Sequence, residues 1–169
     1  ILVASAHWET ASPEVSAPDV NETIHDFHGF PRALYDMRYP AQGAPALAAR
    51  TTDLLHAAGL PAAIDPDRGL DHGAWVPLLL MYPEADIPVA QVSVQTHLGP
   101  AHHYRLGQAL AALRDEGVLV LGSGAYTHNL MELRGLRQQG ITQEPDWVTS
   151  FADWTDSALL EGRVDDLLA

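Results

Sequence analysis

Three histidines lie where the sequence predicts that buried segments reach the surface: His7, His72 and His128. A neutral imidazole binds divalent iron or zinc, and an unligated imidazole moves protons near neutral pH. His7 follows the apolar run 1–6, and His128 follows the apolar run 118–124. Because ligands collect beyond the carboxyl ends of strands in open α/β sheets, we expect these two strand ends to face one site. Taken singly, each histidine is also consistent with a hydrogen-bonded or surface residue.

Three side chains near these histidines could also contribute to a site: Glu9, Trp75 and Tyr126. Glu9 either orients a ligand histidine or caps the turn that follows it. Trp75 either lines a substrate pocket beside His72 or packs in the core. Tyr126, close to His128, is the better candidate for contact with a substrate.

Several familiar motifs are excluded by their spacing. The segment GSGAYT lacks the third glycine of a dinucleotide-binding loop, and Leu121 stands where a G-x-S-x-G elbow around Ser123 needs glycine. The HWE triplet fits the start of a zinc deaminase motif, but the sequence has no cysteine to complete it. There is no H-E-x-x-H motif.

Composition narrows the partners and the compartment. The formal net charge of -13 disfavours nucleic acid and anionic membrane surfaces as partners. The absence of cysteine excludes disulfides, thiolate catalysis and cysteine-type zinc sites, and it permits the reducing cytoplasm, where we expect the protein. No stretch approaches the roughly 18 consecutive apolar residues of a membrane span.

Predicted strands and helices alternate along most of the chain. This alternation predicts an α/β fold with a central, mostly parallel or mixed sheet and helices on both faces. Pro77 is expected in the first turn of a short buried helix, where proline is tolerated. The expected strands cover residues 1–6, 62–65, 88–95 and 118–124, and the expected helices cover residues 44–59, 74–82, 101–117, 146–162 and 163–169.

Four long segments, taken in order, resemble the class III extradiol ring-cleavage dioxygenases, in the branch that resembles 4,5-DOPA dioxygenase. The segments are SAHWET, TIHDFHGFPRALYDMRYPAQGAP, RGLDHGAWVPLLLMYPEADIPVAQVSVQ and LGSGAYTHNL. The resemblance extends from residue 1 to about residue 130. It implies an enzyme that opens the ring of a catechol-type, DOPA-like aromatic with dioxygen.

The resemblance also implies a cofactor and roles for the histidines. The family uses a non-haem metal, usually Fe(II) and in some structures Zn(II), held by two histidines and a third protein ligand. His7 matches a metal ligand in the HW motif of the family. His72 and His128 match histidines that act as acid/base groups, so they are the expected catalytic residues, with Tyr126 and Trp75 as the candidate substrate contacts.

The other two metal ligands of the family lie in an SHG-type motif upstream and a PTPEH-type motif near the C-terminus, and neither motif occurs here. We therefore expect residues 1–169 to form a single α/β dioxygenase-like domain that lacks N-terminal and C-terminal segments of the complete domain. Two alternatives stay open: a metal-binding relative that is not an oxygenase, such as a zinc hydrolase or a binding protein, and an inactive partial fragment. Oligomer formation is also open.

Overall fold

The computed structural model describes residues 1–168 and contains two compact units. The first unit is Ile1–Gly124, and the second begins at Ala125. The organisation of residues 1–169 as a single domain stays a prediction.

The first unit is built on a five-stranded sheet with the strand order β3-β2-β4-β1-β5. The central strand β1 pairs in parallel with both β4 and β5. Strand β2 pairs in parallel with β3 but antiparallel with β4, so the sheet is mixed, as predicted. The strands are β1 (Leu2–Glu9), β2 (Glu14–Ser16), β3 (Ala63–Asp65), β4 (Ala90–Val94) and β5 (Val120–Ser123).

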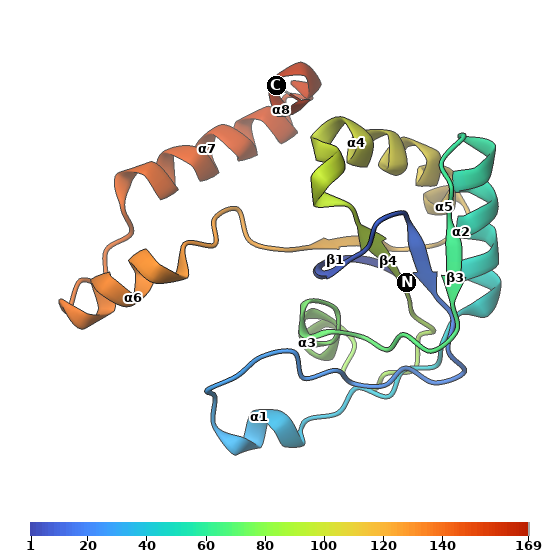
Figure 1. Ribbon diagram of the computed structural model, residues 1–169, viewed down its shortest axis with the longest axis horizontal. Helices are drawn as coiled ribbons and strands as arrows, with labels where there is room; N and C mark the ends of the chain where they lie inside the picture. Colours follow the sequence, from blue (N-terminus) through green and yellow to red (C-terminus); the bar gives the residue numbers. More distant parts are fainter. Residues whose placement is uncertain (169) are drawn as a thin grey trace. The chain divides into compact units, whose positions relative to one another are not determined.

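Helices cover both faces of this sheet. Successive side chains of a strand point to opposite faces, so the neighbours Leu2 and Val3 of β1 enter two different hydrophobic clusters. The Leu2 cluster includes residues of α2, α4 and α5, and the Val3 cluster includes residues of α3. Figure 1 shows α4 and α3 on opposite sides of the strands, with α1 on the side of α3. The predicted α/β class is confirmed. The elements are α1 (Arg32–Asp36), α2 (Pro45–Ala57), α3 (His72–Met81), the 3-10 turn η1 (Thr96–Leu98), α4 (Gly99–Leu110) and α5 (Ala112–Asp115).

Two predicted boundaries are wrong near the histidines. Strand β1 continues to Glu9, so His7 lies within the strand and not after it. Helix α3 begins at His72 because the side chain of Asp71 accepts a hydrogen bond from the backbone N–H of Ala74 and caps the helix. Pro77 consequently lies inside the helix and not in its first turn.

Two further predictions missed local structure. Strand β2 lies in the polar stretch 11–22, where three residues are too few for a periodic pattern to be recognised. The single helix predicted over residues 101–117 is two helices, α4 and α5, which meet at Ala111.

Over residues 125–168, the second unit contains three helices. Asn129 caps α6 by accepting a hydrogen bond from the backbone N–H of Glu132 at 3.1 Å. The helical tail predicted from residue 146 onward is confirmed as far as residue 168 by α7 and α8, and residue 169 of the prediction lies outside the described residues. None of the described helices combines the length and apolar character needed to cross a membrane. The helices are α6 (Leu130–Gln138), α7 (Asp146–Leu160) and α8 (Val164–Leu168).

Candidate active site

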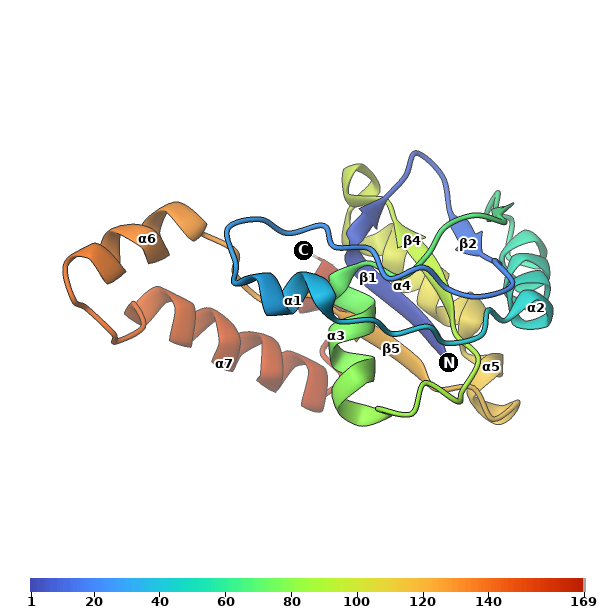
Figure 2. The ribbon, with the colours of Figure 1, turned by 90° about the horizontal axis from the view of Figure 1, so that it is seen from below.

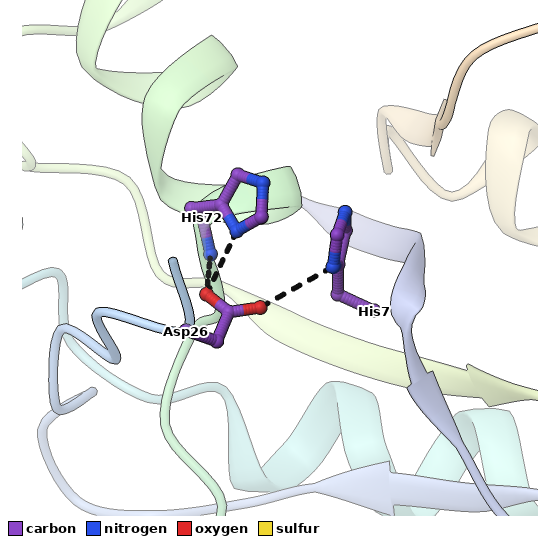
Figure 3. A group of neighbouring side chains, drawn as sticks. All are labelled: His7, Asp26 and His72. Atoms are coloured by element: carbon purple, nitrogen blue, oxygen red, sulfur yellow. Dashed lines mark hydrogen bonds and ion pairs between the residues drawn. The ribbon is translucent and has the colours of Figure 1, made fainter. Parts of the chain in front are cut away.

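Two histidines and an aspartate converge at one place in the first unit: His7 of β1, Asp26 of the loop between β2 and α1, and His72 at the start of α3. Asp26 Oδ1 lies 2.8 Å from Nδ1 of His72, and Asp26 Oδ2 lies 3.4 Å from Nδ1 of His7. The centroids of the two imidazoles are 4.0 Å apart. Figure 3 shows the carboxylate between the Nδ1 edges of both rings. The side chains of His7, Asp26 and His72 are 36%, 26% and 29% exposed, so a ligand can reach them.

A buried carboxylate, that of Asp71, fixes His72 relative to β1. Its Oδ1 accepts a hydrogen bond from the hydroxyl of Ser5 on β1 at 2.6 Å. Its Oδ2 accepts hydrogen bonds from the side chains of Gln91 on β4 and Arg68. Because the same carboxylate caps α3, the first residue of that helix is held at a defined place above the sheet.

The close approach of α3 to β1 depends on Gly73. A Cβ atom at this position would lie 2.3 Å from Oγ of Ser5 and 3.2 Å from Cδ2 of His7. Any side chain here would push the helix from the strand or displace the imidazole. Glycine therefore allows His7 and His72 to come into contact.

The loop that carries Asp26 is held by backbone pairing with the segment before α3. The backbone N–H of Ile24 donates to the carbonyl of Leu70, and the N–H of Leu70 donates to the carbonyl of Glu22, both at 2.8 Å. The indole N–H of Trp75 donates to the carbonyl of Ile24 at 2.9 Å. The position of Asp26 is thus set by the same part of the chain that positions His72.

Asp26 is electrostatically coupled to His72. Burial by itself raises the pKa of the Asp26 carboxyl, but hydrogen bonds from the backbone N–H and the imidazole of His72 outweigh this effect. The pKa of Asp26 is therefore lowered from its ordinary value. The carboxyl is consequently ionised at neutral pH and accepts hydrogen bonds without donating any.

An apolar pocket of about 350 Å³ opens beside His72. It lies between α1 and α3, which are neighbours in Figure 2. His72 is the one titratable side chain of its wall, so the pocket suits an aromatic ring that presents its polar edge to the imidazole. The lining residues are Phe27, Phe30, Leu34, Met37, His72, Trp75, Val76, Leu79 and Leu80.

The structure brings together some of the residues proposed from the sequence. His7 and His72 are in contact, and Trp75, which is 1% exposed, packs in the core and also forms part of the pocket wall. Glu9 accepts a hydrogen bond from the hydroxyl of Thr96 and contacts neither imidazole among the described hydrogen bonds.

His128 and Tyr126 belong to the second unit. His128 is exposed just before α6 and lines a pocket formed by α6, the start of α7 and the loop between them. The hydroxyl of Tyr126 donates to Asp156 at 2.7 Å, and this hydrogen bond raises the pKa of the tyrosine. The roles of both residues stay predictions.

Asp26 is a site residue that the sequence patterns did not predict. It lies in an irregular loop, where no periodicity marks a residue, and its neighbours His25 and His28 carry more obvious chemistry. Its place between two histidines in the segment TIHDFHGFP was the available signal.

The donor atoms of this cluster suit a divalent metal ion. One donor atom from each of His7, Asp26 and His72 lies within 4.8 Å of the others. Two imidazoles and a carboxylate are the donors of many non-haem Fe(II) oxygenases, and zinc accepts the same types. Of this cluster, His7 fits the ligand role that the resemblance assigns to it, and the motifs for the other two ligands of the family do not occur in the sequence.

Comparison with known proteins identifies the class of protein. All 169 residues match the family described as the catalytic LigB subunit of aromatic ring-opening dioxygenase, and the chain belongs to this family. The resemblance inferred from the sequence is confirmed.

Two relatives that the chain resembles carry the same name. The chain is 53% identical over 168 residues to a 4,5-DOPA dioxygenase extradiol of Beta vulgaris, covering 99% of this chain and 61% of the relative. It is 46% identical over 160 residues to the 4,5-DOPA dioxygenase extradiol of Escherichia coli K12, covering 94% of this chain and 57% of the relative. A crystal structure of an uncharacterized Escherichia coli K12 protein superposes with a TM-score of 0.74 at 40% identity, over 94% of this chain and 58% of that protein. The chain thus spans about three fifths of the length of these relatives.

Proposed function

We propose that this protein takes part in the extradiol cleavage of a catechol-type, DOPA-like aromatic by dioxygen, with a non-haem metal as cofactor. The observation that carries the proposal is the contact between His7, Asp26 and His72 beside an apolar pocket, in a chain of an aromatic ring-opening dioxygenase family. The names of the relatives support DOPA or a similar catechol as the substrate. The proposed location is the cytoplasm, which the absence of cysteine permits.

His7 is the proposed metal ligand. Its ring nitrogen Nε2 lies on the side of the imidazole away from Asp26, as Figure 3 shows, and is therefore available to a metal ion. When bound, Fe(II) supplies Lewis-acid and redox chemistry toward the catechol and dioxygen. Zn(II) would supply the Lewis-acid part of that chemistry alone.

His72 and His128 are the proposed acid/base residues. The imidazole of His72 lies at the wall of the apolar pocket, where it can accept a hydroxyl proton from a bound catechol and return a proton later. The apolar wall, including Trp75, orients the ring and excludes water from its face. His128 and Tyr126 are proposed to act on the same substrate because of the family motif that contains them.

Oxygen uptake tests the activity. Protein loaded anaerobically with Fe(II) and then mixed with air and a panel of catechols should consume oxygen and form a yellow ring-opened product. Metal binding without oxygen uptake for any catechol would favour a non-oxygenase relative, such as a zinc hydrolase or a binding protein. Negligible metal binding at micromolar concentration would favour an inactive fragment.

Two substitutions test the assignment of roles. His7→Ala should lose the metal, because it removes a ligand. His128→Ala should keep the metal and lose turnover, because it removes an acid/base group. Metal content and turnover are measured on the same samples, and equal metal loss in both variants would show that the roles are wrongly assigned.

A further inference from the structure

Asp26 faces the same ring nitrogen, Nδ1, on both imidazoles of the site. We propose that Asp26 is a positioning residue that keeps His7 and His72 in the tautomer with the proton on Nδ1, an inference that rests on the function proposed above. Each ring then presents an unprotonated Nε2 on the side away from the carboxylate. The Nε2 of His7 is free for the metal ion, and the Nε2 of His72 is free for a substrate proton.

The contacts between Asp26 and His72 support the Nδ1–H tautomer of His72. Asp26 Oδ1 accepts a hydrogen bond from the backbone N–H of His72 at 2.9 Å and lies 2.8 Å from Nδ1 of its ring. Because an ionised carboxylate is an acceptor without a proton to donate, the ring nitrogen that faces it must be the donor. The backbone contact also fixes the carboxylate relative to the first turn of α3, so it cannot follow a rotating imidazole.

The contact between Asp26 and His7 supports the same tautomer for His7. Asp26 Oδ2 lies 3.4 Å from Nδ1 of His7, slightly longer than a hydrogen bond of ordinary length. A histidine that binds a metal through one nitrogen usually donates its other N–H to a carboxylate or carbonyl, which fixes the tautomer and the ring orientation. Asp26 is placed to accept that hydrogen bond.

Direct coordination of the metal by Asp26 is the competing role. Oδ1 already accepts two hydrogen bonds from His72, and both Nδ1 atoms point toward the carboxylate. A metal ion between these groups would displace the Nδ1 protons and break the contacts that hold Asp26. The observed arrangement therefore favours an orienting role over ligation.

The tautomers can be read in the metal-free 169-residue protein. Long-range ¹H–¹⁵N NMR spectra, recorded about two pH units above the ordinary histidine pKa of ~6.5, distinguish Nδ1–H from Nε2–H. The wild type should show the Nδ1–H form for His7 and His72. Asp26→Ala should shift both rings toward the Nε2–H form, which neutral imidazole prefers without such a partner. Asp26→Asn should shift them less, because its amide oxygen still accepts one hydrogen bond.

Metal affinity gives a second readout. Anaerobic titration with Fe(II), and separately with Zn(II), should show a dissociation constant raised about 10- to 100-fold in Asp26→Ala. The loss should be smaller than in His7→Ala, which removes a ligand. Asp36→Ala is the matched control: this exposed aspartate of α1 makes no described hydrogen bond or ion pair with either imidazole, and its removal should change neither readout.

The outcomes separate this inference from the proposed function. Predominant Nε2–H forms in the wild type, or unchanged tautomers in Asp26→Ala, would overturn the positioning role. Metal loss in Asp26→Asn as severe as in His7→Ala would show that Asp26 is a ligand. Correct tautomers in a protein that consumes no oxygen would contradict the proposed function and leave the role of Asp26 standing.

Discussion

The hydroxyl of Ser5 donates a hydrogen bond to Oδ1 of Asp71 at 2.6 Å, and this contact joins the central strand β1 to the first turn of α3. Both residues are fully buried. Ser5 also accepts a hydrogen bond from the backbone N–H of His7 at 3.1 Å. A single polar contact in the core therefore reaches both histidines of the site, His7 through Ser5 and His72 through Asp71.

Replacing Asp71 should destabilise the fold. In Asp71→Asn, an amide group replaces one carboxylate oxygen, so Ser5, Gln91 and Arg68 cannot all donate to the side chain. We expect a loss of ~2–4 kcal/mol in the free energy of unfolding, measured by urea denaturation. The control is Asp65→Asn at the end of β3. Its side-chain oxygen accepts from backbone N–H groups, which an asparagine oxygen also does, so a similar loss there would contradict the explanation.

Gly73→Ala should force α3 away from β1. The added Cβ would overlap Ser5 Oγ, and we expect a loss of about 1–3 kcal/mol in the free energy of unfolding together with weaker metal binding. Gly107→Ala in α4 is the matched control, because a Cβ there meets nothing within 4 Å. That change should be neutral or stabilising by up to about 1 kcal/mol. Equal effects of the two substitutions in thermal unfolding would contradict the close-approach argument.

A polar side chain in the apolar pocket should weaken catechol binding. Val76→Asn places an amide in the wall of the pocket, and we expect the dissociation constant of 4-methylcatechol to rise about tenfold. Binding is followed by the NMR signal of the Trp75 indole N–H. Met81→Asn changes an exposed residue of the same helix that does not line the pocket, and it should bind as the wild type does. An unchanged dissociation constant in Val76→Asn would show that the catechol binds outside this pocket.

Stability should depend on pH through His102. Burial lowers the pKa of its imidazole below the ordinary value of 6.5, and His103, Arg105 and His97 lower it further. Because the folded pKa lies below the unfolded one, this stabilising contribution is full above pH 6.5 and is lost as pH falls through the folded pKa.

His102→Gln removes this titration and keeps a side-chain donor for Oε1 of Gln95. Between about pH 7.5 and about pH 5, the melting temperature of the variant should fall less than that of the wild type. Melting temperatures that fall in parallel would show that His102 does not contribute.

The sequence predicted those parts of the site that regular elements carry. An apolar run leading to His7 and a helix beginning near His72 are local patterns. The alternation of strands and helices predicted a mostly parallel or mixed sheet covered on both faces, and the sheet is mixed and covered on both faces. The exact start of α3 was missed by two residues, although Asp71, which accepts a hydrogen bond from the backbone N–H of Ala74, is a local N-cap signal.

Asp26 could not be predicted in the same way. Its place depends on backbone pairing between Ile24 and Leu70, which no local pattern in an irregular loop reveals. The short strand β2 escaped prediction for a related reason: its place in the sheet is set by pairing with β3 and β4. Contacts between distant segments therefore determine the positions of Asp26 and β2, and local periodicity does not reveal such contacts.

The pairing of the Asp26 loop with the segment before α3 also sets the order in which the site can assemble. Asp26 and His72 are 46 positions apart in the chain, and Ser5 and Asp71 are 66 positions apart. Contacts of such separation form only after long loops have closed, which is a slow step in folding. During synthesis, a chain that has emerged from the ribosome only as far as α2 contains His7 and Asp26 but not His72. A newly made protein therefore completes this site only when α3 has docked on the sheet.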